Sequence, residues 1–191
     1  VASEQNYHFK ILFYILKKLG FDWADKLYHL SYGLVNLPSG RMKSREGTIV
    51  DADDLLDSLH ADALCAIKER GRDEQVGDAD DVAEKVALGA LHYYLLQATP
   101  IKDMLFNPEE SLSFNGNTGP YLQYMGARIN SILAKASESG IKIDSSDEAV
   151  ALLSGEDEWA LIKQLGDFPS VVKRAAENLD PSGVCSYLYD T

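Results

Sequence analysis

A basic loop between Gly40 and Thr48 has residue types that could handle a polyphosphate. Cations alternate there with hydroxyl groups, and such groups can hold a phosphate chain while charge develops on its bridging oxygen. The P-loop pattern Gly-x-x-x-x-Gly-Lys-[Ser/Thr] is absent. The stretch is therefore either a mobile clamp for a nucleotide or a solvated basic turn. Its central residues are Gly40, Arg41, Met42, Lys43, Ser44 and Arg45.

A second group combines aromatic rings with a base on one predicted helix, from about Thr118 to Ala136. Tyr121, Tyr124 and Arg128 are separated by three and four residues, so all three fall on the same side of that helix. Aromatic rings beside an arginine can stack on bases and bind phosphate. The same tyrosines could equally be half-buried core residues with wet hydroxyls, and spacing alone leaves both interpretations open.

Two Asp-Ala-Asp-Asp tetrapeptides, at residues 51–54 and 78–81, precede helical stretches. An aspartate there can cap the helix, and further carboxylates in the first turn are favoured by the helix dipole. A calcium-binding loop is the alternative interpretation that assigns these carboxylates a chemical role. It is disfavoured because the second stretch lacks the glycine and glutamate that such a loop needs at its sixth and twelfth positions. We therefore expect helix N-termini here and no metal site.

The elements that must position these groups follow from periodicity and chain breakers. Apolar residues recur at three and four residue steps between Glu4 and Leu19, which predicts an amphipathic helix. Leu27 to Leu37, rich in Tyr, Leu and Val, predicts a buried strand that leads into the basic loop. The pattern then stays helical. We expect a mainly α protein, in which a helix-strand-loop remnant of an α/β nucleotide-binding domain precedes an α-helical bundle. Later helices are predicted over 156–165, over 169–178, and from Pro181 onward.

Charge is distributed unevenly along the 191 residues. The formal charge of -12 ordinarily argues against a nucleic-acid partner, since Lys and Arg supply most of the affinity for phosphate. Residues 1–48, however, hold more bases than acids, and residues 115–142 hold three bases against a single acid. A polyanion would meet only selected faces. Two distant cysteines without a Cys-x-x-Cys pair, and no apolar run long enough for a membrane span, favour a reduced intracellular setting.

Four stretches resemble arginyl-tRNA synthetases, which are class I aminoacyl-tRNA synthetases. The longest runs from Tyr32 to Leu55 and is similar to the signature-loop region of that family. The others are Ser3-Glu-Gln-Asn-Tyr-His-Phe9, Val82-Ala-Glu-Lys-Val-Ala87 and Phe114-Asn-Gly-Asn-Thr-Gly-Pro-Tyr-Leu-Gln-Tyr124. Together they extend over about two thirds of the chain, in the family's order.

The resemblance implies roles for individual residues. Arg41 to Arg45 would occupy the Lys-Met-Ser-Lys-Ser loop of class I enzymes, which stabilises the pyrophosphate that leaves ATP, with Lys43 ahead of Arg45 as the charged group. Lys43 and Ser44 are exchanged relative to the family's Ser-Lys. Gln5 would hold the substrate arginine, because an amide oxygen can accept a guanidinium hydrogen bond, and His8 would lie near the nucleotide. Without the resemblance, Gln5 and His8 would be read as solvated or packed residues.

The resemblance also implies an activity, an arginine-tRNA ligase that attaches arginine to its tRNA through arginyl adenylate. ATP with Mg, arginine and tRNA would be the substrates and partners, the location cytoplasmic, and neither a membrane nor DNA is expected. We divide the chain into residues 1–50, the remnant of the catalytic domain; 51–112, a helical connecting and stem-contact region; and 113–191, a truncated helical anticodon-binding domain. The residues implied to touch tRNA are Tyr121, Tyr124 and Arg128.

Missing features leave an alternative. The His-Ile-Gly-His motif of class I enzymes occurs nowhere in the sequence, and Val1 is not an initiator Met. We therefore expect an excised piece of a longer protein that is inactive alone, with neither metal nor nucleotide tightly bound. The competing hypothesis is a non-catalytic helical interaction module derived from a synthetase. A nucleotide-dependent enzyme unrelated to translation is a third hypothesis.

Overall fold

The computed structural model describes residues 1–38, 51–69, 77–142 and 144–191. Its elements follow the order η1 (Ser3–Gln5), α1 (Asn6–Lys18), η2 (Ala24–Lys26), β1 (Val35–Asn36), α2 (Ala52–Glu69), α3 (Ala79–Leu96), β2 (Met104–Leu105), α4 (Pro108–Ser111), α5 (Gly119–Glu138), α6 (Asp147–Val150), α7 (Glu156–Asn178) and α8 (Ser182–Asp190). The expectation of a mainly helical protein is confirmed.

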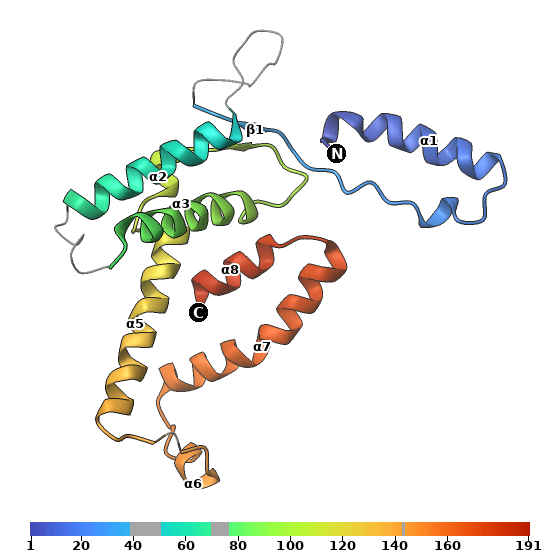
Figure 1. Ribbon diagram of the computed structural model, residues 1–191. Coiled ribbons are helices and arrows are strands. Elements are labelled where there is room, and N and C mark those ends of the chain that lie inside the picture. Colours follow the sequence, from blue (N-terminus) through green and yellow to red (C-terminus); the bar gives the residue numbers. More distant parts are fainter. Residues whose placement is uncertain (39–50, 70–76, 143) are drawn as a thin grey trace.

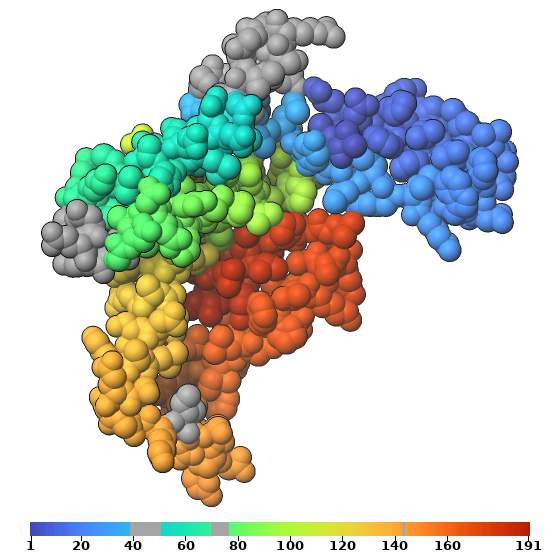
Figure 2. Space-filling model, in the orientation of Figure 1, coloured from blue at the N-terminus to red at the C-terminus, as the bar shows by residue number. Residues whose placement is uncertain are grey.

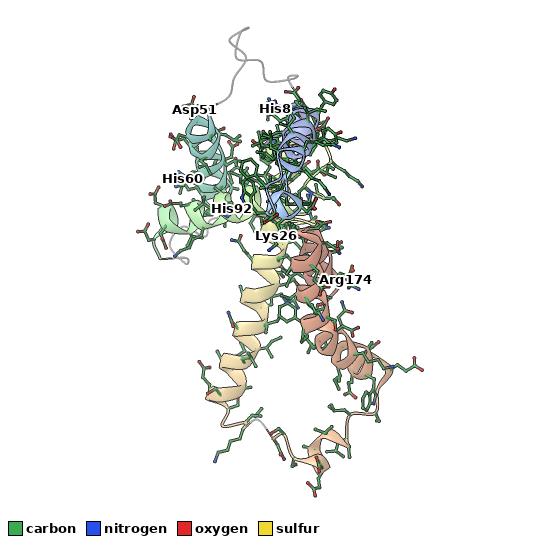
Figure 3. All side chains as sticks on the ribbon, turned by 90° about the vertical axis from the view of Figure 1, so that its right-hand side faces the viewer. His8, Lys26, Asp51, His60, His92 and Arg174 are labelled. Atoms are coloured by element: carbon green, nitrogen blue, oxygen red, sulfur yellow. The ribbon has the colours of Figure 1, made fainter. Side chains whose placement is uncertain are left out.

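The helices are arranged as a small lobe and a larger body (Figures 1 and 2). Helix α1 stands apart and is joined to the body by the extended chain that leads to β1. In the body, α2 lies beside α3, and α5 leads away from α3 toward α6. Helix α7 returns from α6, and α8 ends close to α3. Figure 3 shows α5 and α7 diverging toward α6.

The predicted strand over residues 27–37 is wrong in length and burial. Only Val35–Asn36 forms a strand, which pairs in parallel with Met104–Leu105, and an isolated bridge joins Tyr32 to Ala2. Tyr28 and Leu30 are exposed. A β-strand needs a neighbour to satisfy its backbone groups, and within the described residues few such neighbours line this segment. The apolar run therefore stays extended chain.

The chain is anchored on both sides of residues 39–50, by β1, paired with β2, before this stretch and by Leu55 after it. Leu34 N donates to the Asp103 carboxylate at 2.7 Å, Met104 N to Leu34 O at 2.9 Å and Phe106 N to Asn36 O at 2.7 Å. Val35 and Leu37, before this stretch, and Leu55, after it, pack on one core of Leu59, Ala87 and Phe106. The entry and the exit of the basic stretch are therefore fixed to the same apolar cluster.

The helix starts confirm the capping interpretation of the aspartate tetrapeptides. Asp78 Oδ1 accepts from Asp80 N at 3.1 Å and from Asp81 N at 3.3 Å at the start of α3. Asp51 Oδ1 accepts from Asp53 N at 2.9 Å before α2. No group of three His, Cys, Asp or Glu in the described ranges could hold a metal ion. Both tetrapeptides therefore mark the N-terminus of a helix.

Helix α7 corrects the prediction of two separate helices. Pro169 lies inside a continuous helix of 23 residues, although a proline removes a backbone donor and clashes with the preceding turn. Packing on α8 holds the helix together across that position. The Phe168 and Tyr187 rings lie 5.4 Å apart, and Tyr187 OH donates to Gln164 O at 2.9 Å.

Candidate functional site

The six central residues of the basic loop, Gly40, Arg41, Met42, Lys43, Ser44 and Arg45, lie outside the described residues. The ends of the flanking segments, at Pro38 and Asp51, lie within them. Figure 3 shows Asp51, before α2, and His8, on α1, toward the same end of the molecule. The start of α1 and the residue that follows the loop therefore lie toward one end of the structure.

Gln5 ends the short helix η1 and precedes α1 directly. The chain before it runs parallel to residue 32, since Ser3 N donates to Tyr32 O at 2.7 Å and Tyr32 N donates to Val1 O at 3.2 Å. Both segments thus point the same way, and Gln5 follows the carboxyl end of one of them. The Gln5 side chain is exposed there.

His8 lies one turn further along α1 and is also exposed. Its ring meets the Phe9 ring edge-on, with centroids 5.7 Å apart. Phe9 in turn stacks on His29 at 4.3 Å, which attaches α1 to the extended chain. The structure therefore brings Gln5 and His8 to the same end of α1, with a packed aromatic pair behind them.

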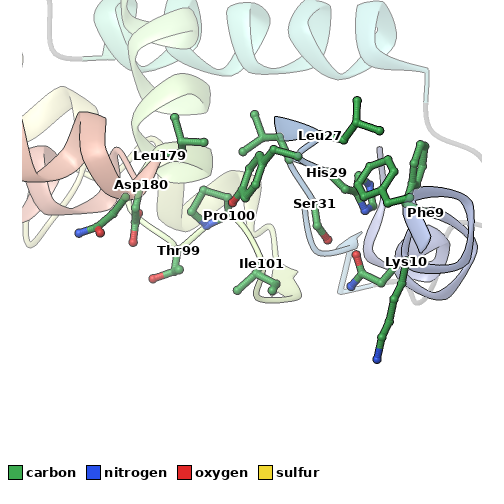
Figure 4. Close-up of a pocket in the computed structure, with 15 residues that line it drawn as sticks. Phe9, Lys10, Leu27, His29, Ser31, Thr99, Pro100, Ile101, Leu179 and Asp180 are labelled. Carbon is green, nitrogen blue, oxygen red and sulfur yellow. The ribbon is translucent and has the colours of Figure 1, made fainter. Parts of the chain in front are cut away.

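A cavity of about 680 Å³ lies below this aromatic pair (Figure 4). This open cavity is lined by α1, the extended chain, the turn at residues 99–101 and the end of α7. The Ser31 side-chain oxygen is buried at its wall and has no hydrogen-bond partner within the described part of the chain. Neither Gln5 nor His8 is among its lining residues, so the cavity is separate from the candidate substrate residues.

Helix α5 presents the aromatic and basic residues that the sequence singled out. The Arg128 guanidinium carbon lies 5.7 Å from the centroid of the Tyr124 ring, and both side chains are exposed. Tyr121 is half-buried, and its ring lies 5.8 Å from that of Tyr189 on α8. The structure thus joins Tyr124 with Arg128 as one exposed pair and engages Tyr121 in packing.

The charge around this pair differs from that of the molecule as a whole. Helix α5 holds Arg128 and Lys135 against Glu138. Among the described helices, only α1 and α5 hold more bases than acids, whereas α2, α3 and α7 are acidic. A polyanion would therefore be directed to α5 or α1 and away from the other long helices.

Tyr93 is a structural centre that the sequence did not reveal. It is 8% exposed, and the single proton of its hydroxyl is shared between Cys185 O, at 2.9 Å, and the Asn117 side-chain oxygen. Burial raises the pKa of Tyr93 to about 12. One side chain therefore connects α3, the turn before α5, and α8. In the sequence, the cluster His92-Tyr93-Tyr94 indicates only residues that pack within a helical region. Nothing in it predicts Asn117 and Cys185 as the partners of Tyr93.

Residues 1–108 match the family described as tRNA synthetases class I (R), catalytic domain. The chain therefore belongs to the class I arginyl-tRNA synthetase family. Residues 122–191 match a second family, the DALR anticodon binding domain. The resemblance inferred from four short stretches is confirmed over most of the sequence.

Individual relatives agree with the family assignment. The chain is 62% identical to an arginine–tRNA ligase of Treponema denticola over its whole length and 58% identical to that of Treponema pallidum over 99% of it. It spans 32% of each, about a third of these relatives. An arginyl-tRNA synthetase structure from Thermus thermophilus matches 92% of the chain, and 28% of that protein is covered, with a TM-score of 0.77 and 34% identity. The Plasmodium falciparum enzyme, at 24% identity, has the same fold with a TM-score of 0.76; it matches 100% of the chain, which covers 32% of it.

No helix in the described ranges is both long and apolar enough to cross a membrane.

Proposed function

We propose that the whole protein attaches arginine to its tRNA in an ATP-dependent reaction and that this chain contributes parts of both the catalytic and the tRNA-binding machinery. The observation that carries the proposal is the match of residues 1–108 to the arginyl catalytic domain, joined to an anticodon-binding match in the same chain. We further propose a cytoplasmic location. The division into residues 1–50, 51–112 and 113–191 remains part of the proposal.

The first step requires positioning and charge stabilisation more than acid-base chemistry. The arginine carboxylate forms a bond to the α-phosphorus of ATP, and the bond from that phosphorus to the bridging oxygen breaks, which releases pyrophosphate. In the proposal Lys43 and Arg45, with Arg41 and Ser44, stabilise the charge that develops on the leaving group. Gly40 and Met42 are proposed to bind the nucleotide, and Mg would accompany ATP.

Substrate recognition is assigned to the start of α1. The Gln5 amide oxygen can accept a hydrogen bond from the arginine guanidinium, and its exposed position directly before α1 supports this role. His8 lies on the same side and is proposed to face the nucleotide.

tRNA recognition is assigned to the exposed face of α5. Tyr124 can stack on an unpaired base while Arg128, over its ring, contacts phosphate. Tyr121 is proposed to support the same surface through its contact with Tyr189. The positive balance of α5 in an acidic chain favours this face for RNA.

The test is pyrophosphate exchange by the full-length protein with each of the twenty amino acids, with and without tRNA. Arginine alone should support exchange, and arginine should then appear on tRNA. Exchange that does not depend on the amino acid would favour a nucleotide-dependent enzyme outside translation. A full-length protein with no exchange under any condition would favour the non-catalytic interaction module.

A further inference from the structure

Helix α5 begins where its backbone touches the backbone of α3. Gly119 is the first residue of α5, and Gly89 lies in the middle of α3. A Cβ on Gly119 would lie closer than 3.0 Å to the carbonyl carbon and oxygen of Gly89, a separation that real Cβ atoms essentially never show. Only a residue without a side chain fits at this crossing.

Two side-chain hydrogen bonds flank the glycine contact. The Gln123 amide donates to Lys85 O at 2.9 Å, and the Tyr93 hydroxyl donates to the Asn117 side chain. Their α3 members are Lys85 and Tyr93, which lie one turn before and one turn after Gly89 on the same face of the helix. The start of α5 is therefore held along a stripe of α3 about two turns long.

The rest of α5 extends away from this joint. Within the described part of the chain, α3 is the chief neighbour of α5, and the Tyr121 contact with α8 also lies in the first turn. From Gly119 to Glu138 the helix has 20 residues and is about 30 Å long. A tilt of about 10° at the crossing would shift Arg128 by about 2 Å and the far end by about 5 Å, given that rise per residue.

We propose that Gly119, at its contact with the backbone of Gly89, is a positioning residue that fixes the direction of α5 and so places Tyr124 and Arg128 against tRNA. This inference rests on the proposed role of α5 in binding tRNA. The Cβ of an alanine at position 119 would displace the backbone of α5 from α3. The helix would still form, because alanine is a better helix former than glycine, but its exposed pair would point elsewhere.

The experiment compares Gly119→Ala with Gly126→Ala in the full-length protein. A Cβ on Gly126, in the same helix, would meet nothing within 4 Å, so this variant is the matched control. Gly119→Ala should weaken the binding of arginine-accepting tRNA about tenfold, in the range of one lost base-stacking contact. Gly126→Ala should stay within about twofold of the unmodified protein. Circular dichroism should give the same helix content for both.

A combined variant separates positioning from general damage. If Gly119 acts through Tyr124 and Arg128, then adding Gly119→Ala to a protein that carries both Tyr124→Leu and Arg128→Gln should weaken its tRNA binding by no more than about twofold. Fully additive losses would mean that Gly119→Ala harms the protein in another way and would overturn the inference. Should Gly119→Ala fail to fold, Gln123→Ala tests the same joint, because it removes the bond to Lys85 while keeping a helix former.

The same variants distinguish a failure of the positioning role from a failure of the proposed function. One outcome is that Arg128→Gln weakens tRNA binding while Gly119→Ala and Gln123→Ala bind tRNA normally. This outcome would overturn the positioning role and leave the proposed function intact. Arg128→Gln that binds tRNA normally would instead reject the α5 face, and the positioning role with it.

Discussion

Lys43 is the single side chain on which the proposed adenylation chemistry depends most. Lys43→Ala in the full-length protein should lower the rate of arginine-dependent pyrophosphate exchange by roughly ten to a thousandfold, the range for one lost contact that stabilises transition-state charge. The loss should fall on kcat more than on the KM for arginine, because pyrophosphate charge develops during reaction. An unchanged rate would remove Lys43 from the mechanism and leave Arg45 as the charged group.

Gln5 should affect the KM for arginine and not kcat. Gln5→Ala removes the proposed acceptor for the arginine guanidinium, so the KM for arginine should rise, by roughly ten to a hundredfold for a hydrogen bond to a charged group. The affinity for tRNA should not change, since α5 lies in a different part of the molecule. Titration of arginine and of tRNA against the same variant makes this comparison, and unaltered arginine affinity would reject the substrate role.

Tyr93 allows a prediction about pH. Its pKa is raised from 10.0 to about 12 by burial, so the folded chain keeps the phenolic proton at a pH where an unfolded tyrosine loses it. The stabilising contribution is complete below pH 10 and is lost as the pH rises toward 12. The free energy of unfolding of the 191-residue chain should therefore fall over this interval, and Tyr93→Phe should show a shallower fall.

The same variant has an effect at neutral pH. Tyr93→Phe leaves the Cys185 carbonyl and the Asn117 side chain without their donor, which should cost about 1–3 kcal/mol of stability. Urea unfolding at pH 7 measures that cost. Tyr93→Phe with the stability and pH slope of the unmodified chain would show that the hydroxyl does not hold α3, α5 and α8 together.

At the scale of elements, Gly33 packs its backbone closely against the turn before β2 and so fixes the chain that leads to the basic loop. A Cβ at Gly33 would lie within 3.0 Å of backbone atoms of Lys102 and Asp103, and Gly33 N donates to Pro100 O at 2.6 Å. Gly33→Ala should destabilise the chain by about 1–3 kcal/mol, as overpacking does. Gly126→Ala, at an open helix position, should instead stabilise it by about 0.5–1 kcal/mol. Urea unfolding of both variants makes the comparison, and equal midpoints would contradict it.

Elements with local signals were predictable, and those that depend on distant contacts were not. The capping of α3 by Asp78 needs only neighbouring residues, so its start was found from sequence. The strand over 27–37 was overestimated because β structure requires a partner that sequence order does not reveal. Pro169 predicts a break because the local cost of a proline in a helix is visible in the sequence, whereas the ring contact of Phe168 with Tyr187, 19 residues away, is not.

The candidate site shows the same division. Spacing along one helix correctly joined Tyr124 to Arg128, since residues four apart are neighbours on an α-helix. The contact of Gly119 with Gly89 could not be predicted from the sequence, because neither residue has a side chain and they lie 30 positions apart. Roles proposed for residues 40–45 came from family resemblance and remain predictions, as do those of Gln5 and His8.

At the scale of the whole molecule, charge should limit how the protein holds RNA. With a formal charge of -12, repulsion opposes any polyanion, and attraction is confined to helices such as α5. Few phosphates can then be neutralised. For one to three contacts by Arg128, Lys135 and Lys142, the slope of log K against log salt should lie between roughly -0.7 and -3, shallower than for a basic RNA-binding protein.

Binding of tRNA to the full-length protein and to the 191-residue chain, measured between about 50 and 300 mM salt, tests this limit. Arg128→Gln should make the slope shallower by roughly 0.7 to 0.9, because one phosphate contact is lost. Tyr124→Leu should weaken binding at every salt concentration without changing the slope, since stacking releases no counterion. A slope that Arg128→Gln leaves unaltered would place the phosphate contacts on other helices. Helix α1 is the next candidate because it holds three bases and no acid, although one of them, Lys17, pairs with Asp25 at 2.7 Å.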